Sequence, residues 1–153
     1  MTAEVAENAE MINEVNRVTE RIIGAAIEVH QVLGRGLLES AYEACLAFEL
    51  AAERGCRVER QRALPVVCRG VQIDCGYRID LLVDGAVIVE LKTVDALKPV
   101  HEAQLLSYLK LSGCHVGLLI NFHVVRLRDG VRRLVNNLPE SASATSAPSA
   151  VGS

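Results

Sequence analysis

The stretch from Tyr77 to Val94 constrains the fold more than any other part of the chain. Two runs rich in Val, Ile and Leu flank Asp84-Gly85, and this pattern predicts a β-hairpin. Asp80, Glu90 and Lys92 interrupt the apolar runs. Because unpaired charge on a buried strand is costly, these residues need a partner. A divalent cation held by the carboxylate oxygens is such a partner, with the lysine beside it.

The length of the hairpin loop decides whether these charges can share a site. A two-residue loop would pair Asp80 with Val89 and put the two carboxylates on opposite faces of the sheet. A three-residue loop over 83–85 would pair Asp80 with Ile88. All three charged side chains would then share one face, because same-face residues recur at every second position. We therefore expect the three-residue loop, or a bulge at Asp80, with Gly85 in the left-handed conformation that closes a type I turn.

The part of the chain before the hairpin is expected to be mainly helical, since its apolar residues recur at helical spacing. Capping residues and glycines set the expected boundaries. We expect, in order, a partly ordered lead-in (1–18) for which a helix is also possible, a helix that Thr19 can cap (19–34), a second helix (38–54) and two strands (56–62 and 64–68).

After the hairpin the pattern returns to a helix and then to strands. We expect a helix (99–111), a buried strand (116–122) and a short terminal hairpin (124–127 with 131–134). Residues 138–153 are rich in Ser and Ala and have the composition of a disordered tail. The order of elements indicates a single α/β domain over 19–137, in which helices pack on a sheet.

Composition limits the classes of function. The chain has 153 residues, half of them hydrophobic, which suits one domain with a full core. Its net charge of −3 gives no general attraction to nucleic acid, so phosphate binding would depend on local arginines that flank the hairpin. The five cysteines form no C-x-x-C motif, which argues against a zinc site and indicates buried free thiols in a reducing compartment. We expect a cytoplasmic protein with no membrane partner, because neither a signal peptide nor a membrane-spanning stretch is evident.

Two of the expected helices carry polar residues at helical spacing. The second helix has the motif G-x-x-E-x-x-Y, formed by Gly36, Glu39 and Tyr42. The helix after the hairpin has a stripe formed by His101, Gln104 and Tyr108. Residues at such spacing share one side of a helix. The side can be a solvated face, which is the commoner case, or the wall of a site.

Taken together, Asp80, the E-x-K motif of Glu90 and Lys92, and the two helical motifs resemble the PD-(D/E)xK nuclease superfamily. More closely, they resemble its small bacterial GxxExxY proteins, over roughly residues 19–137. The resemblance implies a core of helix, three strands, helix and strand, here with an extra N-terminal helix. Ile79 stands where the superfamily motif often has proline.

The resemblance also implies roles for individual residues. Asp80, Glu90 and the backbone carbonyl of Leu91 would hold Mg²⁺ or Mn²⁺, and Lys92 would orient the attacking water. Glu39 would act through water or help to bind a second ion. On the later helix, the catalytic lysine or the phosphate backbone would be contacted by Gln104 and Tyr108. His30 and His101 are further candidates for the wall, although an ordinary hydrogen bond is the simpler role for both.

The implied function is metal-dependent hydrolysis of phosphodiester bonds in nucleic acid, DNA in preference to RNA. The alternative is a non-catalytic module that keeps the nuclease fold and binds nucleic acid or a protein; a homodimer is left open. Without metal, Glu39, Asp80 and Glu90 would crowd like charges. We therefore expect the pKa of at least one carboxyl to be raised, with Lys92 offsetting part of the effect.

Overall fold

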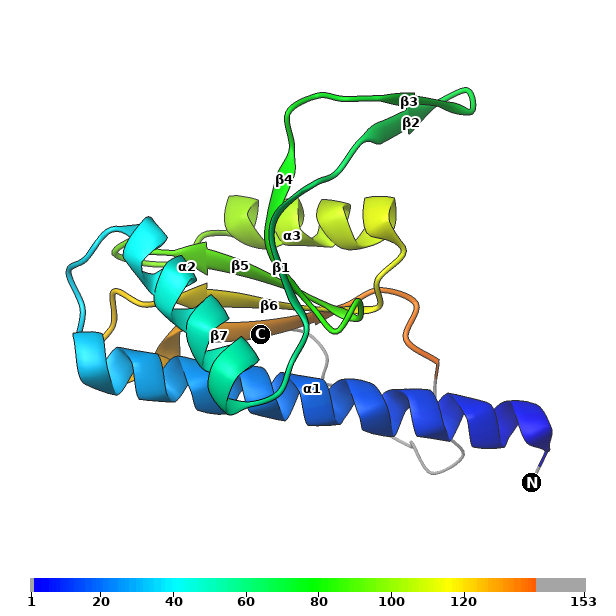
Figure 1. The fold of residues 1–153 in the computed structure, drawn as a ribbon. Coiled ribbons are helices and arrows are strands. Elements are labelled where there is room, and N and C mark those ends of the chain that lie inside the picture. Colours follow the sequence, from blue (N-terminus) through cyan, green and yellow to red (C-terminus); the bar gives the residue numbers. More distant parts are fainter. Residues whose placement is uncertain (1, 140–153) are drawn as a thin grey trace.

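A five-stranded mixed sheet forms the centre of the computed structural model, which describes residues 2–139 (Figure 1). The strand order is β1-β4-β5-β6-β7, and only β5 and β6 run parallel. The strands are β1 (Val58–Ala63), β4 (Arg78–Val83), β5 (Val87–Lys92), β6 (Val116–Asn121) and β7 (Val131–Val135). Of the residues expected to form a disordered tail, those from 140 onward lie outside the described residues.

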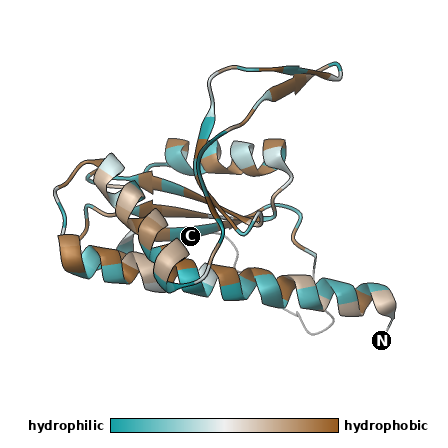
Figure 2. Ribbon diagram, viewed as in Figure 1, coloured by the Kyte–Doolittle hydropathy of each residue, from teal (hydrophilic) through white to brown (hydrophobic). Residues whose placement is uncertain are grey.

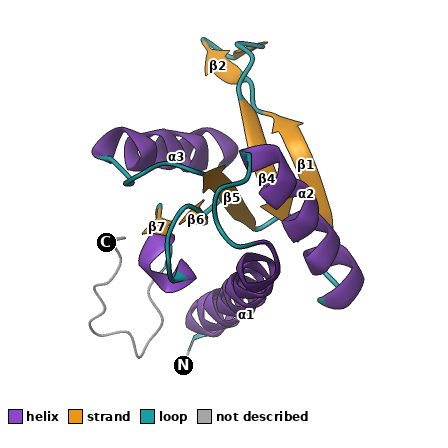
Figure 3. Ribbon diagram, turned by 90° about the vertical axis from the view of Figure 1, so that its left-hand side faces the viewer, coloured by secondary structure: helices purple, strands orange, loops and turns teal. Residues whose placement is uncertain are grey.

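Helices cover both faces of this sheet, as Figure 3 shows. On one face lie α1 (Ala3–Leu33) and α2 (Glu39–Phe48), the second of which continues into a π-helical turn, η1 (Glu49–Glu53). The other face packs against α3 (Pro99–Ser112), which connects the parallel pair β5 and β6. Each face has its own apolar core. The expected α/β class and the order of elements are confirmed. None of the helices within residues 2–139 combines the length and the apolarity needed to cross a membrane.

The first helix is longer than expected. α1 starts after Thr2, whose hydroxyl accepts a hydrogen bond from Val5 N, and it continues without a break to Leu33. The expected helix start at Thr19 is wrong, because Thr19 is buried in mid-helix and its hydroxyl donates to Asn16 O at 2.9 Å. The apolar stripe of the lead-in and that of the following segment therefore form one continuous face against the sheet.

The hairpin of β4 and β5 has the expected loop length in a shifted position. Val83 pairs with Val87, so the loop covers residues 84–86 instead of 83–85. Both Asp84 (φ 53°) and Gly85 (φ 64°) are left-handed, as in a type I′ turn, so the expected type I turn is wrong. This turn matches the right-handed twist of paired strands.

The predicted pairing of this hairpin is wrong at Asp80. Regular pairs run from Val83↔Val87 to Leu81↔Val89, so Ile88 pairs with Leu82 and not with Asp80. Before Leu81 the alternation of faces along β4 is broken, because Ile79 and Leu82 are buried in the same core cluster. The register therefore does not decide the face of Asp80; the hydrogen bond from Asp80 N to Glu90 Oε2 brings the two residues together.

The expected terminal hairpin of 124–127 with 131–134 is wrong. A 3₁₀ turn, η2 (Leu127–Gly130), follows the bend after β6, and β7 pairs antiparallel with β6 from Val116↔Val135 to Ile120↔Val131. The reason is that β6 is buried along its whole length. Its second edge needs hydrogen-bond partners, and β7 supplies them.

A separate two-stranded arm, β2 (Val66–Cys68) and β3 (Val71–Ile73), projects from the sheet (Figure 1). Figure 2 shows brown, apolar residues on this arm as well as on the central strands. The arm explains why the expectation of buried thiols fails in part. All five cysteines are free, but Cys68 and Cys75 are exposed on or beside the arm and only Cys56 is fully buried.

Candidate functional site

The candidate site lies where β4 separates from β5. Regular pairing of these strands stops at Leu81 and Val89, while β4 continues along β1 as far as Arg78. Two carboxylates take over the hydrogen bonds in the gap. Asp80 N donates to Glu90 Oε2 at 2.9 Å, and Leu91 N donates to Asp80 Oδ2 at 2.9 Å. The end of the sheet is thus closed by side chains that are also the candidate metal ligands.

Glu90 is the most perturbed acid of this site. Its side chain is only 5 % exposed, and burial raises its pKa to about 8. The neighbouring Asp80 carboxylate adds to this rise and Glu43 adds further, whereas the Asp80 backbone N–H and the Lys92 ammonium lower the pKa. The expected rise of one carboxyl pKa, partly offset by Lys92, is confirmed. A buried acid with such a pKa is typical of a functional site.

Lys92 is held by α3, the helix that packs on one face of the sheet. Its Nζ donates to Gln104 Oε1 at 3.5 Å, and Gln104 Nε2 donates to the Tyr108 hydroxyl at 3.2 Å. Burial, and next the Glu90 charge, raise the pKa of Tyr108, which stays a neutral phenol. α3 therefore brings Gln104 to Lys92 and Tyr108 to Gln104.

Glu43, not Glu39, is the helical acid that contacts this group. Glu39 is exposed and makes no hydrogen bond or ion pair to another part of residues 2–139. Glu43 lies one helical turn further along α2, is 8 % exposed, and accepts a hydrogen bond from Gln61 Nε2 at 2.7 Å. The same nitrogen donates to Asp80 Oδ1 at 3.2 Å. No sequence pattern predicted the contacts of Glu43 and Gln61; for Glu43 the available signal was its i, i+4 spacing from Glu39.

The tyrosine of the G-x-x-E-x-x-Y motif has a structural position. Tyr42 is fully buried and stacks on Phe122, with ring centroids 4.4 Å apart. Its hydroxyl donates to Gly34 O at 2.6 Å and accepts from Leu37 N at 3.3 Å. The motif therefore fastens the loop between α1 and α2 and fixes the start of the helix that carries Glu43.

Replacing Tyr42 with phenylalanine should lower the free energy of unfolding by roughly 1–2 kcal/mol, because two backbone groups lose their partner while the stacked ring remains. Urea unfolding would measure this loss. Tyr77→Phe is the matched control, since Tyr77 is exposed and its hydroxyl has no hydrogen bond within the described residues. Equal stability of Tyr42→Phe and the wild type would show that the hydroxyl does not fasten the loop.

The two histidines make ordinary hydrogen bonds. His30 Nε2 lies 2.9 Å from Val124 O, and His101 Nδ1 accepts from Lys98 N at 3.0 Å at the start of α3. In the described residues, both histidines therefore have the simpler expected role, an ordinary hydrogen bond to the backbone.

A buried asparagine holds the segment that follows Lys92. Asn121, at the end of β6, is 2 % exposed. Its side chain accepts from Val94 N at 3.1 Å and donates to Val94 O at 2.8 Å. Phe122 N also donates to Lys92 O at 2.9 Å. These bonds fix the direction in which β5 leaves the sheet, and so the place from which the Lys92 side chain starts.

The donor set suits a hard cation with a largely hydrated shell. No cluster of three or more His, Cys, Asp or Glu side chains suited to a metal lies within residues 2–139. Asp80 and Glu90 offer two adjacent carboxylates, and the Leu91 carbonyl faces the same side as its N–H. Mg²⁺ typically binds through one or two carboxylates and keeps several waters. Two crowded carboxylates, one of them buried, also provide the negative charge that a cation would neutralise.

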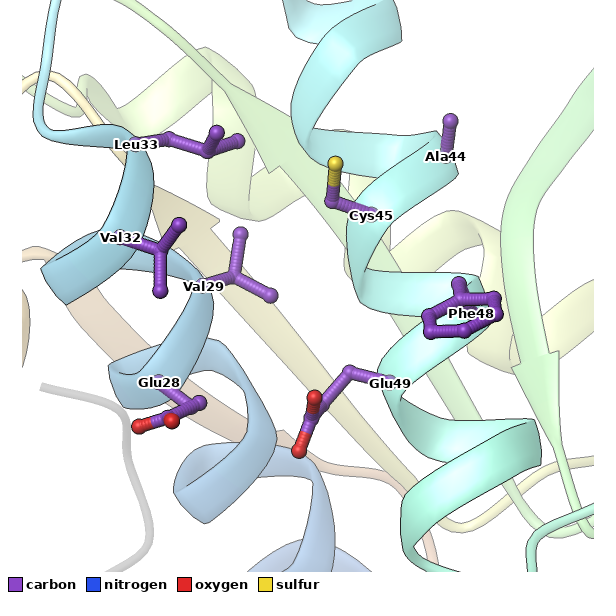
Figure 4. Close-up of a pocket in the computed structure, with 8 residues that line it drawn as sticks. All are labelled: Glu28, Val29, Val32, Leu33, Ala44, Cys45, Phe48 and Glu49. Atoms are coloured by element: carbon purple, nitrogen blue, oxygen red, sulfur yellow. The ribbon is translucent and has the colours of Figure 1, made fainter.

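The apolar groove between α1 and α2 is separate from this chemistry. Figure 4 shows it, a cavity of about 250 Å³ whose walls include Val29, Val32, Cys45 and Phe48. None of the candidate site residues lines it. The site is therefore identified by its charges and hydrogen bonds, and the groove has no part in the function proposed below.

Comparison with known proteins agrees with the geometry. The family model described as the PD-(D/E)XK nuclease superfamily matches residues 16–134, which include α2, the whole five-stranded sheet up to Leu134, and α3. No curated protein and no solved structure gives a significant match. Nucleases of this superfamily generally use divalent metal ions and act on nucleic acid. On the strength of the family match, supported by the fold, the chain belongs to the PD-(D/E)XK nuclease superfamily.

Proposed function

We propose that this protein is a Mg²⁺- or Mn²⁺-dependent nuclease that hydrolyses phosphodiester bonds, in DNA in preference to RNA. The observation that carries the proposal is the pair of carboxylates that closes the opened end of β4 and β5 beside Lys92. A buried, mutually repelling acid pair weakens the metal-free fold, so it is best explained by a ligand that the pair binds. The motif G-x-x-E-x-x-Y supports the finer assignment to the GxxExxY proteins.

Each residue has a role that its position supports. Asp80, Glu90 and the Leu91 carbonyl would hold the cation, which supplies Lewis-acid polarisation of the phosphate and a bound water of lowered pKa. The Lys92 ammonium lies beside the acid pair, where it would orient that water and stabilise the negative charge that develops on the phosphate. Gln104 accepts from the ammonium and restricts its position, and Tyr108 in turn holds Gln104.

A metal titration crossed with a panel of single- and double-stranded DNA and RNA tests this proposal. We expect cleavage products with Mg²⁺ or Mn²⁺, none with a chelator, and faster cleavage of DNA than of RNA. If the purified protein binds Mg²⁺ but cleaves no member of the panel, the nuclease proposal fails. The non-catalytic binding module would then be the better account.

A further inference from the structure

Gln61 has a backbone conformation that its position in a strand does not explain. It lies in β1, where its neighbours keep their register with β4, so it faces Asp80 across the ladder. Its φ is 51°, in the left-handed region that side chains other than glycine, asparagine and aspartate rarely adopt. Such strain persists only where the surroundings enforce it, and it is concentrated at functional sites.

The strained conformation brings two adjacent side chains to one carboxylate. In a regular strand, Arg60 and Gln61 would point to opposite faces. Here Gln61 Nε2 donates to Glu43 Oε1 at 2.7 Å, and Arg60 Nε donates to Glu43 Oε2 at 3.2 Å. Because Glu43 is 8 % exposed, its ionised form needs these donors.

The Gln61 carboxamide also reaches the candidate metal ligand. A carboxamide nitrogen carries two hydrogens, and the second bond of Nε2 goes to Asp80 Oδ1 at 3.2 Å. The other Asp80 oxygen accepts from Leu91 N. One amide thus bridges a helical acid and a strand acid, and together with the Leu91 N–H it fixes both oxygens of Asp80.

We propose that Gln61 is a positioning residue. It orients Asp80 for the cation, and Glu43 in turn fixes the position of the Gln61 carboxamide. The proposal rests on the proposed function, since the cation is the one that Asp80 and Glu90 would bind. It assigns Glu43 an indirect role through Gln61, and it explains why β1 keeps a left-handed residue at this point of the ladder.

The variant Gln61→Asn separates positioning from folding. Asparagine tolerates the left-handed conformation but is one methylene shorter, so its amide cannot span both carboxylates. We expect the affinity for Mn²⁺, measured by calorimetric titration with manganese chloride, to fall about 10- to 100-fold, as is usual when a residue that orients a metal ligand is lost. The metal-free variant should still unfold cooperatively in urea, with a somewhat lower midpoint because Glu43 loses one of its two donors. Gln72→Asn, the same change on the exposed arm, should alter neither.

A double-mutant cycle with Glu43→Gln tests the link to the helix. If Glu43 acts through Gln61, the double variant should lose no more affinity than the weaker-binding single variant. If the two losses of affinity multiply, the link is wrong. Wild-type affinity in Gln61→Asn, or a metal-free Gln61→Asn that no longer unfolds cooperatively, would overturn the positioning role. A wild-type protein that binds no Mn²⁺ would instead refute the proposed function, and this inference with it.

Discussion

Lys92→Ala is expected to reduce phosphodiester cleavage by roughly 10²–10³-fold or more while leaving Mn²⁺ affinity within about threefold of the wild type. The reason is that the ammonium acts on the water and the phosphate and is not a metal ligand. Single-turnover cleavage rates and calorimetric titration would measure the two quantities. Lys110→Ala, an exposed lysine at the end of the same α3 helix, is the control and should change neither.

The same pair of measurements should give a different result for Asp80→Asn, which loses both cleavage and metal affinity because it removes a charged ligand oxygen. Asparagine is preferred to alanine here, since its side-chain oxygen can still accept from Leu91 N and keep the end of the sheet closed. If Lys92→Ala lost metal binding as completely as Asp80→Asn, the separation of roles between ammonium and carboxylates would be wrong.

The second large effect concerns stability and pH. The pKa of Glu90 is about 8 in the folded protein, against the ordinary 4.5 of a free glutamate carboxyl. Between these values the folded state keeps a proton that the unfolded state has released, so the free energy of unfolding falls as pH rises from about 4.5 to 8. Glu90→Gln removes this loss. In the absence of metal, the free energy of unfolding of the variant, relative to that of the wild type, should therefore increase by roughly 3–5 kcal/mol as the pH rises from about 4.5 to 8.

Urea unfolding at a series of pH values with a chelator present would measure this gain. Glu20→Gln, the same replacement at an exposed position of α1, should follow the wild type at every pH. A difference between Glu90→Gln and the wild type that does not change with pH would contradict the raised pKa. Saturating Mg²⁺ should reverse the order of stability, because the cation binds the ionised carboxylate that only the wild type has.

Local patterns predicted most of the fold. They failed where residues distant in the sequence determine a helix boundary or a strand pairing. The apolar runs around Asp84-Gly85 located the β4–β5 hairpin, and Pro99 located the start of α3. Thr19 is a good capping residue, but the apolar stripe before it packs on the same core and overrides the local signal. Likewise, the free edge of β6 decides the pairing of Val131–Val135, and the order of residues along the chain does not show that edge.

In the site, residues of one hairpin were predictable and residues brought by other elements were less so. The hairpin pattern predicted that Asp80 and Glu90 come together, although the predicted pairs are wrong. Gln104 was recognised by its motif. Glu43 and Gln61 meet only because α2 packs on the sheet and because one residue of β1 is left-handed. Neither a period of two nor a period of 3.6 signals such a contact.

Because side chains close the last rung between β4 and β5, two backbone amides become reporters of the site. The Asp80 and Leu91 N–H groups donate to the carboxylates of Glu90 and Asp80, respectively, and not to backbone carbonyls. Their hydrogen-exchange rates therefore depend on what those carboxylates are bound to, whereas the amides of neighbouring rungs depend on the sheet itself. Hydrogen exchange at these two amides can therefore report protonation or cation binding at the site in the absence of substrate.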